Sequence, residues 1–162
     1  MPILFTNVHV FDGVDEQRIE NANVVVTGNL ITEVSAEPLA VANARVIDGG
    51  GRTLMPGLMD AHVHLALVRR PGEIRNTYDW MYVGALAAVQ AEEMLLRGFT
   101  TVRDIGGPTV GLHRAIEEGR IVGPRIFSSG PYITQTSGHG DFRNYNEPHP
   151  GISGELSPME RQ

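Results

Sequence analysis

The chain has 162 residues, a formal net charge of −6 and 41% hydrophobic residues, an ordinary composition for a globular protein. Its basic residues are not clustered and no apolar run approaches the roughly 20 residues that span a bilayer, so we expect no nucleic-acid or membrane partner. The N-terminus resembles no signal peptide, and we expect a soluble, cytoplasmic protein. Cysteine is absent, which excludes disulfides and thiolate metal ligands. Lysine is absent too, so no step that needs a lysine can be completed by these residues.

The first part of the chain is rich in short β-branched runs that end at turn-forming residues. Extended segments are expected over residues 3–10, 23–27, 30–34 and 45–48. The pair Gly28-Asn29 between the second and third segments is typical of a β-hairpin. The three glycines 49–51 are expected to end the fourth segment. This pattern predicts a small β-domain with open strand edges that pair with strands from elsewhere.

From Thr53 the pattern changes to alternating strands and helices. Strands are expected over residues 58–65, 99–103 and 124–128, and helices over residues 78–97 and 109–118. One narrow arc of the longer helix is expected to pack on a sheet, and it contains Ala87, Ala88, Ala91, Met94 and Leu95. Gly98 should cap this helix, and Gly119 should end the next one. Short connections of this kind predict βαβ units and a parallel sheet, followed after residue 129 by a long functional loop.

His62 and His64 are the residues with the clearest chemical potential. Side chains alternate along a strand, so the two imidazoles should project on the same side and could bind one divalent ion together. The carboxylate of Asp60 should join them there and orient one imidazole. The intervening residues are expected to face the helices instead: Ala61, Val63 and Leu65.

The stretch TLMPGLMDAHVH, residues 53–64, resembles the T-x-x-P-G-L-x-D-x-H-x-H signature of the metal-dependent amidohydrolase superfamily. The resemblance implies an α/β fold. A small N-terminal β-sandwich-type domain would cover residues 1–55. Residues 56–162 would form the first three strands and intervening helices of a TIM (β/α)₈ barrel. Because a complete barrel takes roughly 250 residues, the barrel is expected to be truncated.

The resemblance also implies a centre with one or two divalent ions, most often zinc, that activates water for attack on an amide carbonyl. His62 and His64 would be its first two ligands, with Asp60 supporting them. In dinuclear members a carboxylated lysine bridges the ions, two later histidines bind the second ion and an aspartate transfers protons. We expect all of these catalytic residues beyond Gln162 and none within this chain, which agrees with the absence of lysine.

A second stretch, TSGHGD at residues 136–141, resembles a loop in the subgroup of Xaa-Pro dipeptidase-like and imidazolonepropionase-like members. It implies that His139 contacts the substrate, against the alternative of a solvent-exposed loop histidine. Arg103 is a further candidate for substrate binding, although an internal ion pair or structural role is open for both Arg103 and Asp104. Asp141 could orient His139 or belong to a turn. Structural or surface positions are expected for the other histidines: His9, His113 and His149.

Three functional hypotheses follow. The complete protein would hydrolyse amide or peptide C–N bonds in small molecules, such as dipeptides or N-acyl amino acids. Alternatively, the chain would be a non-catalytic fragment or subunit that needs a complementing chain, since two histidines alone hold zinc poorly. A binding module with incidental histidines is the third reading. Exposed β-edges favour a homo-oligomer or association with the missing C-terminal part.

Overall fold

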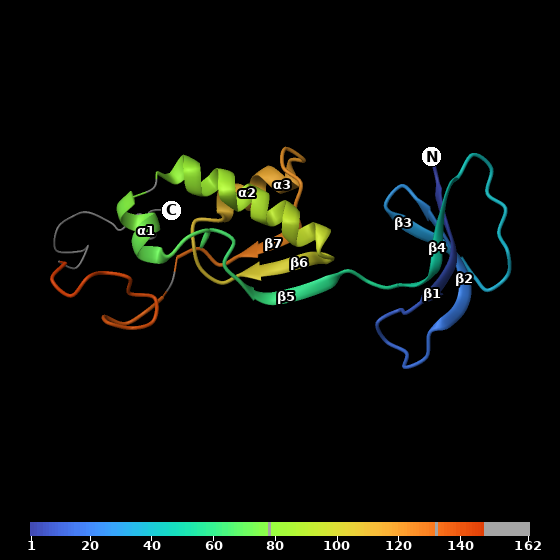
Figure 1. Ribbon diagram of the computed structural model, residues 1–162, viewed down its shortest axis with the longest axis horizontal. Helices are drawn as coiled ribbons and strands as arrows, with labels where there is room; N and C mark the ends of the chain where they lie inside the picture. Colours follow the sequence, from blue (N-terminus) through green and yellow to red (C-terminus); the bar gives the residue numbers. More distant parts are fainter. Residues whose placement is uncertain (78, 132, 148–162) are drawn as a thin grey trace. The chain divides into compact units, whose positions relative to one another are not determined.

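The computed structural model describes residues 1–77, 79–131 and 133–147, and the chain divides into two compact units, Met1–Pro56 and Gly57–Gln162. Figure 1 shows the first unit as a sheet and the second as a sheet with helices. Within the described residues, no helix is both long and apolar enough to cross a membrane.

The first unit is a four-stranded sheet in the order β3-β2-β1-β4. Its strands are β1 (Ile3–Val10), β2 (Ile19–Thr27), β3 (Leu30–Ser35) and β4 (Arg45–Leu54). The expected hairpin around Gly28-Asn29 is confirmed, because β2 and β3 pair antiparallel with Thr27 opposite Leu30. Gly28 adopts a φ of 65°, which glycine accepts without steric cost.

Strand β4 continues through the three glycines that were expected to end it. The ladder between β1 and β4 is irregular there, since Thr6 pairs with Asp48 and Val8 with Arg52, which leaves extra residues on β4. A Cβ on Gly49 would lie 2.2 Å from a methyl carbon of Val8, so glycine permits the close approach of β4 to β1. The expectation of a strand end was wrong because these glycines form a bulge within the strand.

The second unit is a parallel sheet in the order β5-β6-β7, as the sequence predicts. Its elements are β5 (Leu58–Val63), α1 (Pro71–Thr77), α2 (Trp80–Leu96), β6 (Phe99–Asp104), α3 (Val110–Glu117) and β7 (Arg125–Ser128). Helices α2 and α3 lie over one face of this sheet (Figure 1). Helix α1 was not expected; it begins at Pro71, a residue well suited to a first helical position.

The packing of α2 follows its sequence pattern. Ala87 and Ala91 are buried on the predicted face, and Met94 packs against the cluster formed by the sheet residues. That cluster joins all three strands and contains Val63, Leu65, Val102 and Ile126. The helix begins after Asp79, whose carboxylate accepts the Tyr82 N–H at 3.0 Å. It ends at the predicted cap, where Gly98 has a φ of 97°.

Candidate metal centre

His62 and His64 lie together at the carboxyl end of β5. His62 is on the strand and exposed, whereas His64 follows directly after the strand and is half-buried. Their ring centroids are 5.4 Å apart and the ring planes meet at 85°. The two imidazoles therefore form a compact pair of nitrogen donors at the strand end, where parallel α/β sheets bind their ligands.

The strand that carries these histidines contains an irregularity. Asp60 pairs with Val102 and Val63 pairs with Asp104, so three residue steps on β5 face two on β6. One extra residue on a strand breaks the simple alternation of side chains. Val63 is buried as predicted, whereas Ala61 is exposed. In this register Asp60 pairs with Val102, a buried residue of β6.

Asp60 interacts with the main chain of the histidine segment. Its Oδ1 accepts the His62 N–H at 2.9 Å. The carboxylate thus stabilises the irregular backbone at His62, while its predicted contact with an imidazole stays a prediction.

The imidazole of His64 is oriented by a backbone carbonyl. Its Nδ1 lies 3.4 Å from the Gly106 oxygen, which comes from the loop after β6. In the tautomer that donates from Nδ1 to this carbonyl, Nε2 carries the lone pair that a metal ion takes. This is the arrangement commonly found behind a histidine ligand.

A buried carboxylate lies directly behind this segment. Asp104 ends β6 with no exposed surface, and its two oxygens accept the N–H groups of Leu65 at 2.7 Å and Gly106 at 3.1 Å. Burial raises the pKa of the Asp104 carboxyl above its ordinary value. That pKa is lowered in turn by these two N–H groups, by the nearby His64 and by the Thr109 hydroxyl.

Arg103, one of the two substrate-binding candidates, is exposed beside the histidine strand. Its Nε donates to the Ala61 carbonyl at 2.8 Å and so ties β6 to the irregular part of β5. This contact gives the guanidinium a structural role, which the sequence had left open. A contact with substrate stays a prediction.

His139, the other candidate for substrate binding, is exposed on the loop that follows β7. Among the contacts of the described residues, none joins its ring to His62 or His64. Asp141 organises this loop, because it accepts the Ser137 N–H at 2.8 Å and binds Arg143 through both oxygens, at 2.7 and 2.6 Å. These bonds hold the pKa of Asp141 well below its usual range. Asp141 therefore acts as the turn residue of its two predicted roles.

Replacing Asp141 by Asn should open this loop. The variant loses the ionic, two-point contact with Arg143, so trypsin should cleave after Arg143 roughly five- to tenfold faster, since cleavage follows the population of the open form. Timed digestion with mass spectrometry measures this rate. Cleavage after Arg97, which is bound to Glu93, serves as the internal reference and should not change. Equal rates after Arg143 in both proteins would contradict this assignment.

The remaining histidines in the described residues have structural partners. His9 is paired with Glu20 in the first unit. His113 contacts the Ile126 carbonyl through Nδ1, and its Nε2 lies 3.0 Å from Glu117, so it attaches α3 to β7. His149 lies outside the described residues.

The histidine pair fits part of a metal centre. Two adjacent imidazoles suit zinc and similar divalent ions, which prefer nitrogen donors. Across the described ranges, no group of three or more potential ligands comes together. Further ligands would therefore have to come from residues outside these ranges, as expected from the sequence.

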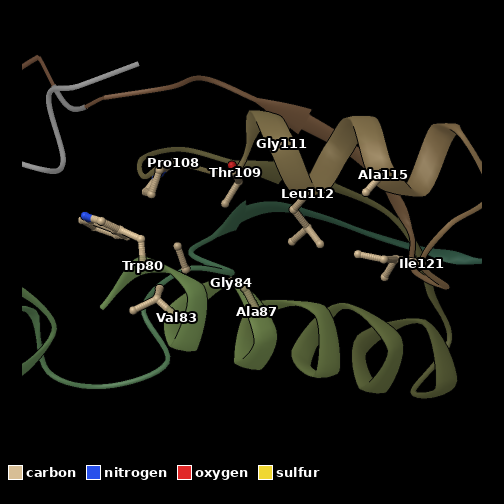
Figure 2. Close-up of a pocket in the computed structure, with 11 residues that line it drawn as sticks. Trp80, Val83, Gly84, Ala87, Pro108, Thr109, Gly111, Leu112, Ala115 and Ile121 are labelled. Atoms are coloured by element: carbon tan, nitrogen blue, oxygen red, sulfur yellow. The ribbon is translucent and has the colours of Figure 1, made fainter. Parts of the chain in front are cut away.

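The helical side of the sheet carries an apolar cavity of about 550 Å³ between α2 and α3. Figure 2 shows its lining, which runs from Trp80 to Ile121 and includes the small residues Gly84 and Ala87. Neither His62 nor His64 belongs to this lining. The cavity is thus a packing feature of the two helices, separate from the histidine pair.

Comparison with known proteins identifies the family. The sequence profile of the amidohydrolase family matches residues 53–159. The chain belongs to the amidohydrolase family. Members of this family are generally metal-dependent, and the matched residues begin at the threonine of the predicted signature and include both histidines.

Individual relatives agree with this assignment. Ochratoxinase of Aspergillus niger is 32% identical over 137 residues, covering 79% of this chain and 28% of that protein. Dihydroorotase of Streptococcus thermophilus is 37% identical over 103 residues, covering 62% of this chain and 21% of that protein. The chain thus spans less than a third of the length of either relative.

Among solved structures, the chain is similar to dipeptidases. A prolidase complexed with N-methylphosphonate-L-proline has a TM-score of 0.85 and 34% identity, covering 99% of this chain and 39% of that one. A Xaa-Pro dipeptidase with methionine in its active site has a TM-score of 0.79 and 29% identity, covering 92% of this chain and 39% of that one. The predicted α/β fold and the resemblance to Xaa-Pro dipeptidase-like members are confirmed.

Proposed function

We propose that the complete protein is a metal-dependent hydrolase of amide or peptide C–N bonds in small molecules. The observation that carries this proposal is the pair of imidazoles of His62 and His64, 5.4 Å apart at the end of β5, with His64 backed by the Gly106 carbonyl. Family membership supports the hydrolase class, and the position of the pair within the matched residues supports its role in metal binding.

Zinc is the ion we propose for this site. When bound, a zinc ion polarises the scissile carbonyl and lowers the pKa of water towards about 7. His62 and His64 would supply two nitrogen ligands. Asp60 would fix the backbone of His62 by accepting the His62 N–H. The remaining ligands and the proton-transferring groups would come from outside the described residues.

For the substrate we propose dipeptides or N-acyl amino acids. The similarity to a prolidase and to a Xaa-Pro dipeptidase supports dipeptides with a C-terminal proline as the first probes. His139, exposed on the loop after β7, would contact the substrate, and Arg103 is the second residue proposed for that role.

The decisive experiment uses the natural protein, stripped of metal with a chelator and then restored with Zn²⁺. Xaa-Pro dipeptides, other dipeptides and N-acyl amino acids are offered with the metal-free and the zinc-restored protein. Hydrolysis should disappear on chelation and return with zinc, and His139→Asn should lower kcat/KM for the preferred substrate about tenfold if its ring binds substrate. Hydrolysis that persists after chelation and in His62→Ala would refute the proposed function.

A second candidate concerns the 162 residues taken alone. Because the described residues bring together only two potential ligands at this site, the isolated chain should lack activity and require a complementing chain. Metal-dependent amide hydrolysis by a polypeptide of verified 17.6 kDa, lost in His62→Ala, would disprove this.

A further inference from the structure

A single buried carboxylate contacts both backbone segments that hold His64. Asp104 Oδ2 accepts the N–H of Leu65, the residue that follows His64, at 2.7 Å. Asp104 Oδ1 accepts the N–H of Gly106 at 3.1 Å, and the carbonyl of that same glycine faces His64 Nδ1 at 3.4 Å. One side chain therefore fixes both the chain at the ligand and the acceptor that orients its ring.

We infer that Asp104 is a positioning residue for the metal centre, which sets the direction of the His64 imidazole through the main chain without reaching the ion. This inference rests on the proposed function, because it takes His64 as a metal ligand. A displaced Leu65 would carry His64 with it, and a displaced Gly106 would remove the acceptor behind Nδ1. Either movement turns Nε2 away from the position that a metal requires.

The chemistry of the site requires a carboxylate. Two backbone donors converge on Asp104, the N–H groups of Leu65 and Gly106, and the hydroxyl of Thr109 favours the ionised form of the same carboxyl. A carboxylate has two acceptor oxygens, whereas an asparagine offers one and turns an NH₂ group towards a donor. Asp104 has no exposed surface, so water cannot replace a lost bond there.

The backbone around Asp104 is fixed to both neighbouring strands. Ile105 donates its N–H to the Val63 carbonyl at 3.2 Å, and Ser129 donates to the Asp104 carbonyl at 2.9 Å. The Thr109 hydroxyl also lies 2.8 Å from the Ser128 hydroxyl at the end of β7. The carboxylate thus acts from a rigid position between the ends of three strands, which is what an orienting group needs.

The test compares the zinc affinity of the natural protein with that of Asp104→Asn, His64→Ala and the control Ile126→Val. Ile126→Val removes a methyl group from the same core cluster but touches no hydrogen bond of the His64 segment. Affinity is measured by competition with a chelator, and the visible spectrum of the cobalt(II) forms reports ligand geometry. Asp104→Asn should lose about 10- to 100-fold in zinc affinity and show an altered cobalt spectrum, whereas Ile126→Val should match the natural protein in both.

The outcomes separate the two proposals. If His64→Ala loses zinc while Asp104→Asn keeps the natural affinity and spectrum, Asp104 is not a positioning residue and the proposed function stands. If the natural protein binds no zinc, or His64→Ala binds it equally well, the proposed function fails and the inference fails with it. If Ile126→Val loses affinity as much as Asp104→Asn, general destabilisation explains the effect and the inference is overturned.

A milder variant keeps the inference testable if Asp104→Asn does not fold. Thr109→Val preserves the shape of the side chain but removes a hydroxyl that favours the ionised Asp104 carboxylate. Zinc affinity should fall in the same direction by a smaller factor, with a shift in the cobalt spectrum. Natural affinity and spectrum in a folded Thr109→Val protein, with Asp104→Asn unfolded, would overturn the inference.

Discussion

Replacing either His62 or His64 by alanine in the natural protein will abolish zinc retention and lower kcat/KM for amide hydrolysis by about 10³-fold. A catalytic metal supplies several kcal/mol of transition-state stabilisation, and about 4 kcal/mol corresponds to this factor. The two imidazoles lie side by side, so the loss of either one would remove a ligand from the proposed centre. Zinc content by atomic emission and steady-state kinetics measure the two effects.

The matched control is His9→Ala. His9 lies on β1, in the other compact unit, and is bound to Glu20. We expect full zinc content and kcat/KM within twofold of the natural protein. In the metal-free state, the free energy of unfolding of His62→Ala and of His64→Ala should lie within about 0.5 kcal/mol of that of the natural protein, because these side chains are exposed or half-buried. Normal zinc content in a variant with both His62→Ala and His64→Ala would show that neither histidine is a zinc ligand.

Much of the architecture could be predicted because local pattern and tertiary packing agree. The run Phe99–Asp104 is rich in β-branched residues and forms β6 as expected, extended by one residue. Helix α2 buries the alanine face that its period predicted and ends at Gly98. His62 and His64 were brought together by a two-residue spacing, so their proximity depended little on the rest of the fold.

The support behind the histidines could not be predicted in the same way. The extra residue between Asp60 and Val63 exists only relative to β6, and no local signal in the sequence marks it. The contact of Asp104 with Leu65 spans 39 positions in the sequence, so its partner follows from the pairing of two strands. The sequence placed Asp104 at the strand end but could not distinguish an ion pair from a carboxylate that binds backbone N–H groups.

Replacing Gly57 by alanine will destabilise the protein by about 1–3 kcal/mol, the usual cost of overpacking. Gly57 is the glycine of the Pro-Gly pair that precedes the histidine strand. A Cβ there would lie 2.1 Å from the Thr100 Oγ1 and 2.6 Å from the Thr100 Cβ, far inside contact distance. The start of β5 would have to move away from β6, against the hydrogen bond from the Leu58 N–H to the Gly98 carbonyl at 2.8 Å.

A double-mutant cycle tests whether the side chain of Thr100 is the reason why position 57 requires glycine. In a Thr100→Gly background the obstructing side chain is gone, so Gly57→Ala should cost less than about 0.5 kcal/mol, which gives a coupling of about 0.5–3 kcal/mol. Gly84→Ala on α2 is the matched control, since nothing lies within 4 Å of its added Cβ, and it should stabilise the helix by about 0.5–1 kcal/mol. Denaturant or thermal unfolding of the four proteins gives the cycle. An equal cost of Gly57→Ala in both backgrounds would show that Thr100 does not impose the glycine. This coupling would also connect Gly57 with the histidine pair, because the position of the start of β5 determines where His62 and His64 lie.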